Sequence, residues 1–508
     1  MALKDRIRRK NRTVKEINEK IWSGDVCVLT VSDMKDLIEN EGIEIAFDEV
    51  DVVTTGTMGA MCSSGAIVNL GHSDPPIKIR DAWINDVPVC HPGAAVDLYI
   101  GAAMMSETQP FRYGGGHVIE DLLAGEQVEL RARSYGTDCY PRTSLRTTLT
   151  KDDLNQFILL NFRNAYQRYA CAVNGRDETI YTYMGKLLPH YRNGHYSGSG
   201  ELNPLTNDPD YETLGLGTKI FLGGGRGYII GEGTQHSPGN RYGNIMVKGD
   251  AKHMNPEYIR GASFTKYGTS IYIGLGVPIP ILNMEIVEKV RIRDEDVETE
   301  VIDYGVPKRD RPSLSKTNYK ELKSGNIELG ERKVKVSSMS SLKKAYEICE
   351  KLKEWIEKGV FTLTEPIEQL PSDIVFKPMK VSTENRYVGD ILHRGVTCTE
   401  DADVEDIARR LIDEQVNHII VIDADSRLRG IITSWDVTGY VASGRERLAE
   451  LITREVHTTT VDEPIGTASR RMADKNVSAL PVLDDDGKVL GIVTSEDIAK
   501  IIGGGFYG

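Results

Sequence analysis

GIITSWDV at residues 430–437 and GIVTSEDI at residues 491–498 are nearly the same sequence, and they lie 61 residues apart. The same offset pairs residues 416–423 (VNHIIVID) with residues 477–484 (VSALPVLD). A repeat of this length without gaps predicts one βαββα-like unit built twice. The last quarter of the chain therefore has the character of a sensor, and any chemistry is expected in the first three hundred residues.

The polar residues of the repeat point to a ligand. Thr433 and Thr494 are placed to cap helices, with Asp436 and Asp497 at the third helical position in a weak capping box. Capping alone does not explain why the same polar residues are duplicated. A helix N-terminus with a free hydroxyl attracts a phosphate or carboxylate, and an aspartate one turn further accepts hydrogen bonds from ribose hydroxyls. The pattern favours a ligand with a ribose and an anionic group.

Length and composition narrow the class of protein. A chain of 508 residues is expected to hold two to four domains. Its net charge of −13 argues against a nucleic-acid groove, and no apolar run approaches the roughly 18 residues that cross a bilayer. The seven cysteines are odd in number and form no C-x-x-C, so we expect free thiols, a reducing cytoplasm, and no local zinc or iron–sulfur motif.

The fold class predicted is α/β, a mixed α+β large N-terminal domain followed by the tandem repeat. We expect boundaries at residues 1–300 for the catalytic domain, 301–385 for a connector arm and helix belonging to it, and 386–443 and 444–508 for the two repeats. Residues 303–330 are polar and predict an extended connector. Residues 151–173 have a helical pattern. A clean amphipathic helix is expected between a cap at Ser340 or Ser341 and Gly359.

Two cysteines of the large domain lie in glycine-rich, polar surroundings, namely Cys62 in TTGTMGAMCSSG and Cys139 in RARSYGTDCYPR. Glycines let backbone amides approach a small substrate and stabilise an anion. Arg131, Arg133 and Arg142 flank Cys139 and favour its thiolate, which is the reactive form. Both cysteines are candidate catalytic residues, and the alternative for each is a small buried side chain.

The remaining cysteines carry weaker signals. Cys27, Cys171 and Cys349 lie in apolar patterns and are expected in the core. Cys90 and its neighbour His91 are assigned no role, because adjacent residues rarely face each other on a regular element.

A glycine-rich stretch at residues 215–236 (GLGTKIFLGGGRGYIIGEGTQH) invites comparison with dinucleotide-binding loops. No G-x-G-x-x-G register fits, since the third glycine counted from Gly223 falls on Tyr228. Two interpretations stay open: a turn that lines the active site, with Arg226 or His236 contributing, or a purely structural turn.

Both parts of the chain resemble known families. Residues 388–503, with both motif copies intact, resemble a CBS-domain pair, which implies adenosyl binding at Thr433, Asp436, Thr494 and Asp497, or a structural, oligomerising role. Residues 10–370 resemble the archaeal homocysteine-biosynthesis family of L-aspartate semialdehyde sulfurtransferases, some of which carry such a pair. The motifs are TTGTMGAMCSSGAIVNLGH, SYGTDCYPR, GLGTKIFLGGGRGYIIGEGTQH, DYGVPKRDRPSL and GVFTLTEPIEQLP.

The resemblance implies conversion of L-aspartate semialdehyde to L-homocysteine with a sulfur donor, a small ferredoxin-like reducing partner and the two cysteines Cys62 and Cys139. On this hypothesis a Cys139 persulfide delivers sulfur to the aldehyde carbon and Cys62 resolves the sulfur bond. The substrate carboxylate calls for a bidentate arginine, and the candidates are Arg131, Arg133, Arg142 and Arg226.

Two other functions are kept as alternatives: a nicotinamide-dependent aldehyde oxidoreductase with a cysteine nucleophile, and a non-catalytic adenosyl-sensing scaffold. The missing dinucleotide fingerprint counts against the first, and the two glycine-flanked cysteines count against the second. If homocysteine is the product, S-adenosylmethionine becomes the favoured adenosyl ligand, with AMP or ATP as the less specific choice. A homodimer through the CBS pairs is also expected, with no nucleic acid, membrane or metal involved.

Overall fold

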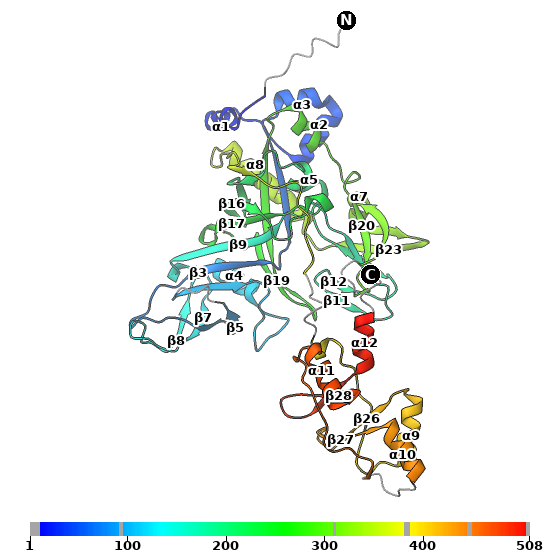
Figure 1. The fold of residues 1–508 in the computed structure, drawn as a ribbon. Helices are drawn as coiled ribbons and strands as arrows, with labels where there is room; N and C mark the ends of the chain where they lie inside the picture. Colours follow the sequence, from blue (N-terminus) through cyan, green and yellow to red (C-terminus); the bar gives the residue numbers. More distant parts are fainter. Residues whose placement is uncertain (1–10, 91–94, 308–310, 380–386, 444–449, 504–508) are drawn as a thin grey trace. The chain divides into compact units, whose positions relative to one another are not determined.

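The computed structural model describes residues 11–90, 95–307, 311–379, 387–443 and 450–503. The chain divides into two compact units, Met1–Lys377 and Pro378–Gly508. The first contains mixed strands and helices and the second contains the duplicated sequence (Figure 1). The predicted fold class, a mixed α/β domain followed by a tandem repeat, is therefore confirmed.

Ten strands of the first unit form one sheet in the order β1-β2-β19-β15-β16-β17-β9-β3-β6, with β18 paired to β19. Strands β1 and β2 of this sheet pair in parallel. Strand β2 runs antiparallel to the long strand β19 over nine residue pairs. The strands are Val28–Thr30 (β1), Val52–Ala60 (β2), Ser64–Asn69 (β3), Asp97–Gly101 (β6), Gln156–Asn164 (β9), Lys219–Leu222 (β15), Gly225–Glu232 (β16), Ile245–Asp250 (β17), Ile259–Phe264 (β18) and Gly268–Pro280 (β19).

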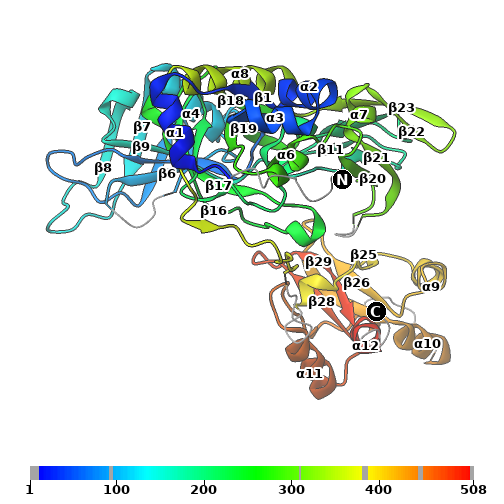
Figure 2. The ribbon, with the colours of Figure 1, turned by 90° about the horizontal axis from the view of Figure 1, so that it is seen from above.

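The predicted amphipathic helix is α8 (Leu342–Glu357), which packs on β2 and β19 with α1 (Val14–Ser23) and α2 (Val31–Glu41) beside it (Figure 2). The Ser341 side chain caps it by accepting from the Lys344 amide. Glycine brings the helix close to the sheet, because a Cβ at Gly56 would lie 2.3 Å from the Ala345 carbonyl oxygen. This glycine of the TTGTMGAM stretch therefore serves helix packing rather than the approach of a substrate.

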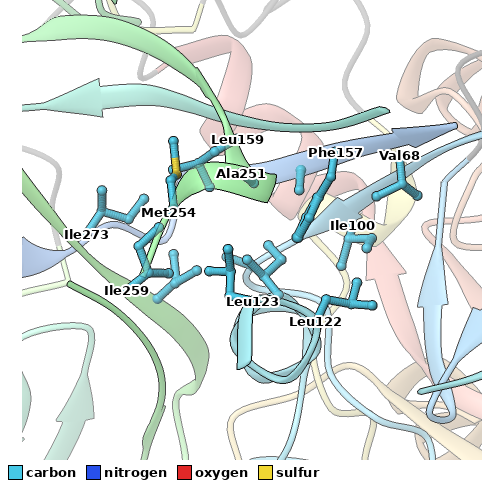
Figure 3. Packing of buried hydrophobic residues seen from close by; sticks show 14 of the residues in the cluster. Val68, Ile100, Leu122, Leu123, Phe157, Leu159, Ala251, Met254, Ile259 and Ile273 are labelled. Carbon is cyan, nitrogen blue, oxygen red and sulfur yellow. The ribbon is translucent and has the colours of Figure 1, made fainter. Parts of the chain in front are cut away.

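A second helix, α4 (Gly115–Ala124), covers another part of the sheet. Its Leu122 and Leu123 pack against Phe157 of β9, Ile100 of β6 and Ile259 of β18 (Figure 3). All five side chains are at most 2% exposed, so this cluster is a dry core rather than a ligand site.

The first unit also contains a four-stranded sheet, a six-stranded sheet and two pairs of short strands. A four-stranded sheet has the order β5-β4-β7-β8, and a six-stranded sheet has the order β21-β20-β10-β13-β23-β22. Their strands are Asp81–Ile84 (β4), Val87–Val89 (β5), Val128–Arg133 (β7), Ser144–Leu149 (β8), Cys171–Val173 (β10), Asn193–Tyr196 (β13), Glu298–Asp303 (β20), Ser313–Asn318 (β21), Asn326–Leu329 (β22) and Arg332–Ser338 (β23).

These sheets correct two expectations from the sequence. Residues 303–330 are not an extended connector, because β21, the helix α7 (Tyr319–Lys323) and β22 lie in this stretch and bury Tyr319 and Leu322. Residues 151–173 are not helical either: after a short 3-10 turn they form β9 and β10. Residues 303–330 looked like a connector because their strands carry polar residues on the outer face of a half-exposed sheet.

The second unit confirms the sequence repeat residue by residue. Its first half contains β25 (Thr397–Cys398), α9 (Val404–Asp413), β26 (His418–Ile422), β27 (Leu428–Thr433) and α10 (Ser434–Ser443). The second half contains α11 (Ile465–Lys475), β28 (Ala479–Leu483), β29 (Val489–Thr494) and α12 (Ser495–Gly503). Ile419 pairs with Ile432, and Leu480 pairs with Val493 at the same offset. The first half is therefore the predicted βαββα-like unit, and the second half repeats it with an isolated parallel bridge between Thr459 and Val482 in place of the first strand.

Lys35 on α2 is an unusual buried cation of the first unit. Its Nζ donates to the Glu201 carbonyl oxygen (2.9 Å) and to Asn207 Oδ1 (3.3 Å), and its side chain is 1% exposed. Burial lowers the pKa of Lys35 to about 7. Between that pH and the usual lysine pKa of about 10.4, the unfolded chain binds the proton and the folded chain does not.

Stability is therefore expected to rise with pH through this window, and Lys35→Met should remove the Lys35 contribution. The difference in free energy of unfolding, wild type minus variant, should grow by up to about 1.4 kcal/mol per pH unit above pH 7. Urea unfolding at pH 6, 7, 8 and 9 measures it. Lys343→Met, at an exposed position of α8, is the control. Parallel curves for wild type and Lys35→Met would contradict the account.

Candidate functional site

A cavity of about 640 Å³ lies in the first unit and contains one of the two candidate cysteines. Cys62 occupies the turn between β2 and β3 and is half-buried. The rest of the wall comes from both large sheets and their loops, including Ser63, Arg163, Ser197, Gln235, Ile302 and Met339. Thiol, cation and hydroxyl groups therefore share one cavity.

Six tyrosines line this cavity, from segments far apart in the sequence: Tyr166, Tyr169, Tyr183, Tyr242, Tyr267 and Tyr304. Their rings are in contact, with centroids 5.3 Å apart for Tyr166 and Tyr242 and 5.9 Å apart for Tyr183 and Tyr304. Burial raises the pKa of Tyr169, Tyr242 and Tyr304, so these phenols are neutral and can donate hydrogen bonds at neutral pH.

Tyr272 lies close to the Cys62 turn, because it pairs with Ala60, two residues before Cys62. Tyr267, in the turn before β19, lines the cavity together with Cys62. Burial raises the pKa of both phenols.

Arg163 is the cation of the cavity wall, and the sequence interpretation missed it. Its Nη1 donates to Gln235 Oε1 (2.6 Å). Among the described residues, its buried Nε has no hydrogen-bond partner, and neither has the buried Ser63 Oγ. Unpaired buried polar atoms are costly, so a ligand with acceptor atoms fits here. Arg163 is the last residue but one of β9. It lies in the stretch that looked helical, which concealed its position.

Cys139 is placed elsewhere. It lies exposed in the loop of residues 134–143 that joins β7 to β8, with its Sγ 3.5 Å from Thr137 Oγ1. The Tyr140 ring stacks on His72 at 5.5 Å, and Arg142 Nε donates to the Pro75 carbonyl oxygen (3.0 Å). These contacts hold the loop against the segment that follows β3.

The two candidate cysteines therefore lie at opposite ends of β3. Cys62 precedes the first residue of the strand, whereas the segment holding the Cys139 loop follows the last. The ladder continues past that end, since the Leu70 amide donates to the Val96 carbonyl oxygen. A strand of this length spans ~17 Å, and a disulfide needs Cα atoms about 4.4–6.8 Å apart. One chain cannot join these two sulfur atoms in this conformation.

The four arginines expected to hold a substrate lie outside the cavity wall. Arg131 and Arg133 lie over the Trp83 ring, at 4.8 and 5.2 Å, and Arg131 also approaches Asp86 at 3.7 Å. Arg142 is bound to backbone carbonyls as described above, and Arg226 Nη2 donates to the Val360 carbonyl oxygen (2.6 Å).

The glycines of the stretch at residues 215–236 form a structural hairpin, while its residue Gln235 lies on the cavity wall. Gly223 and Gly224, with φ of 58° and 85°, join β15 to β16 as a hairpin, with no helix following the glycines. His236 is buried and bonded to the carbonyl oxygens of Asn244 and Pro371. Neither Arg226 nor His236 lines the cavity, whereas Gln235 does.

Other cysteines and groups play no part in this cavity. Cys171 and Cys349 are buried in the core as predicted, and burial raises the pKa of Cys171 to about 12. Cys27 is half-buried, Cys90 is exposed, and His91 lies outside the described residues. Within the described ranges, no cluster of three or more His, Cys, Asp and Glu side chains is arranged to hold a metal ion. The helices in those ranges include none long and apolar enough to cross a membrane.

The second unit carries both capping boxes that the sequence predicts. Thr433 Oγ1 donates to Asp436 Oδ2 (2.5 Å) and accepts from the Asp436 amide (3.2 Å). Thr494 and Asp497 make the same bonds at 2.6 and 3.2 Å. Thr433 also lines a cleft of about 170 Å³ between the two halves of the repeat, whose other residues include His418, Thr453, Glu455, His457 and Ser478.

A contact with His393 distinguishes the two motif aspartates. His393 Nε2 lies 3.1 Å from Asp497 Oδ2. The residue at the matching offset is Arg454, which pairs with Glu400 (2.6 Å) instead of Asp436. The Asp436 carboxylate therefore lacks the side-chain contact that His393 makes with Asp497.

Comparison with known proteins covers both units. Residues 26–363 match the family model described as homocysteine biosynthesis enzyme, sulfur-incorporation, and residues 388–443 and 448–504 match the CBS domain. An L-aspartate semialdehyde sulfurtransferase of Methanocaldococcus jannaschii is 50% identical over 97% of this chain and 99% of its own. One of Methanosarcina acetivorans is 48% identical over the same shares.

A solved CBS-domain pair, crystallised with 5′-methylthioadenosine and S-adenosyl-L-methionine, is 38% identical to this chain. It covers 24% of this chain and 98% of its own, with a TM-score of 0.23.

Proposed function

Because the chain belongs to the family of homocysteine biosynthesis enzymes that incorporate sulfur, we propose that it converts L-aspartate semialdehyde to L-homocysteine. The observation that carries this proposal is the cavity that combines the Cys62 thiol with Arg163 and tyrosine hydroxyls. A substrate with one aldehyde and one carboxylate needs a sulfur nucleophile, a cation and hydrogen-bond donors in one enclosed place. The cavity supplies all three.

Arg163 is the candidate ligand of the substrate carboxylate. A guanidinium binds a carboxylate through charge-assisted hydrogen bonds, and Arg163 is a residue of the cavity wall. Gln235 orients the guanidinium from the other side. In this role Arg163 takes the place assigned to Arg131, Arg133, Arg142 and Arg226 by sequence alone.

The sulfur is delivered through a persulfide on Cys139. Its outer sulfur adds to the aldehyde carbon, and a Cys62 thiolate then attacks Cys139 Sγ, which forms a disulfide and releases the sulfur with the substrate carbon. Loss of water and reduction give the thiol. From the persulfide to the thiol, the reaction takes up about four electrons and four protons and releases one water. Two of the electrons reduce the sulfur, and the other two reduce the carbon. A small ferredoxin-like protein is the proposed electron source.

The positions of the cysteines set a condition on this route. Because Cys62 and Cys139 lie at opposite ends of β3, transfer requires either movement of the 134–143 loop or a Cys139 from a second copy of the chain. A second copy is part of the proposal for other reasons too. Ile412 on α9 and Trp435 and Val441 on α10 are 75%, 82% and 78% exposed, and such an apolar patch suits a homodimer through the CBS pairs.

The CBS pair is proposed to sense an adenosyl compound, with S-adenosylmethionine favoured over AMP or ATP. Thr433 lines the cleft at a helix N-terminus, where an anionic group is stabilised, and Asp436 lies one turn further for the ribose hydroxyls. S-adenosylmethionine is made from methionine and hence lies downstream of homocysteine. The seven free cysteines support a cytoplasmic setting.

The cysteine assignment predicts that Cys62→Ser and Cys139→Ser each lower homocysteine formation at least 100-fold. The assay supplies L-aspartate semialdehyde, a sulfur donor and a reductant, and Cys90→Ser is the exposed-cysteine control. Mass spectrometry should find one added sulfur atom on Cys139 in wild type. An equal mixture of the two inactive variants regains activity if a second copy supplies Cys139. Full activity of either variant alone would refute the route.

Arg163→Gln is expected to raise KM for L-aspartate semialdehyde about 10- to 100-fold, since it removes a charged hydrogen bond to the carboxylate. Arg226→Gln is the matched control, because Arg226 bonds only to a backbone carbonyl among the described residues. Steady-state kinetics separate KM from kcat. If the control shifts KM and Arg163→Gln does not, the substrate is held elsewhere.

Asp436→Asn is expected to weaken binding of S-adenosylmethionine about 10-fold or more, as asparagine keeps the helix cap but loses the charge facing the ribose. Asp497→Asn should have a smaller effect, because Asp497 is already engaged by His393. Calorimetric titration of the full chain with S-adenosylmethionine and with AMP measures this, with Asp486→Asn as control. Unchanged affinity in both variants would leave the repeat a structural role.

A further inference from the structure

We propose that Tyr183 is a catalytic acid of the sulfur-addition step, which donates its hydroxyl proton to the aldehyde oxygen while Tyr169 and Tyr304 hydrogen-bond to its oxygen. The proposal rests on the proposed function, since it names a further residue of the same cavity. Tyr183 lines that cavity together with Cys62 and Arg163.

The local fold presents Tyr183 to the cavity on a short hairpin. Strands β11 (Ile180–Thr182) and β12 (Gly185–Leu187) are joined by Tyr183 and Met184 alone. The turn is held from within, because Thr182 Oγ1 accepts from the Met184 amide (3.0 Å) and donates to the Gly185 carbonyl oxygen (3.1 Å). Gly185 has φ of 86°, a conformation that glycine adopts without strain.

The hairpin is also anchored from outside. His195 on β13 bonds through Nδ1 to the Met184 carbonyl oxygen. A Cβ at Gly185 would lie 2.8 Å from the same His195 nitrogen, so the turn sits directly on the six-stranded sheet. A phenol fixed in this way loses little orientational freedom when a substrate binds, which a general acid requires.

The hydroxyl of Tyr183 is the centre of a hydrogen-bond chain. Tyr169 donates to it across 3.2 Å, and the Tyr304 oxygen lies 2.6 Å away. The Arg311 guanidinium lies over the Tyr304 ring at 4.2 Å. When Tyr183 gives up its proton, its phenolate can accept from both neighbours, and the nearby cation favours negative charge at this end of the chain.

The neighbours are suited to remain donors. Burial raises the pKa of Tyr169 and of Tyr304 above the usual range of a phenol. Both neighbours therefore keep their protons and can donate to the Tyr183 oxygen. Tyr267, by contrast, is exposed, and the Tyr166 and Tyr242 rings pack on each other in a tilted arrangement.

The step is balanced in atoms and charge. A sulfur lone pair forms the C–S bond, the π pair of the carbonyl moves to oxygen, and that oxygen takes the Tyr183 proton. No electron is gained or lost here, so the reductant acts only later. The phenolate recovers its proton from water through the hydroxyl chain.

Tyr183→Phe removes only the hydroxyl and tests the assignment in the full chain. We expect kcat for homocysteine formation to fall about 100-fold or more, with KM for L-aspartate semialdehyde changed less than about threefold, because substrate binding is left to Arg163. Tyr181→Phe is the matched control: Tyr181 is on the same hairpin, two residues earlier, and is not part of the cavity wall. It should keep wild-type kcat.

A double-mutant cycle separates a chemical from a structural role. Tyr169→Phe alone should lower kcat about 10-fold, but it should have no further effect in a Tyr183→Phe background, since its hydrogen bond acts through the Tyr183 oxygen. Additive losses, a kcat of Tyr183→Phe within threefold of wild type, or an equal loss in Tyr181→Phe would overturn the assignment. Full activity of Cys62→Ser would instead refute the proposed function, whatever Tyr183 does.

Discussion

The pairing of β2 with β19 fixes the position of the site. Val52 lies opposite Pro280 and Ala60 opposite Tyr272, and the Met61 amide extends the ladder to the Ile271 carbonyl oxygen. This register places Cys62 immediately after the last paired residue, where the chain turns into β3. It also sets Tyr272 beside the thiol and leaves the Tyr267 turn at the same rim. A shift of one residue would exchange the two faces of β2 and would bury the wrong side chains under α8.

The packing of α8 explains why that register is stable. Gly56 on β2 and Gly276 on β19 face each other in the ladder, and a Cβ at Gly276 would lie 2.7 Å from Ile348 of the helix. Two facing glycines therefore form a groove that accepts the apolar stripe of α8, including Cys349 and Leu352. Dispersion and burial across this groove tie helix and sheet into one layer. The glycine-rich sequence that resembles a substrate loop is, at these positions, a packing surface.

How much the sequence could predict depended on whether a signal was local. The repeat, its caps and α8 rest on spacings within a few turns, and they were predicted to within one or two residues. The cavity was not, because its tyrosines meet only through long-range sheet pairing and stand more than a hundred residues apart at the extremes. Arg163 was missed because the aromatic residues after Asn161 recur at helical spacing, with polar residues between them. Its alternating burial in β9, with Asn161 bonded to Ser64, is visible only in the sheet.

The separation of the two cysteines has a consequence for the chemistry. A thiol in a cavity lined by tyrosines is less accessible to bulky thiols, whereas a thiol on an exposed loop can meet a sulfur donor of any size. On the proposed route, Cys139 in the second setting accepts the sulfur and Cys62 in the first takes part in its use. A persulfide formed at the surface then has to reach the cavity while the aldehyde is bound there. The movement or assembly that joins the two sites is therefore a natural point of control.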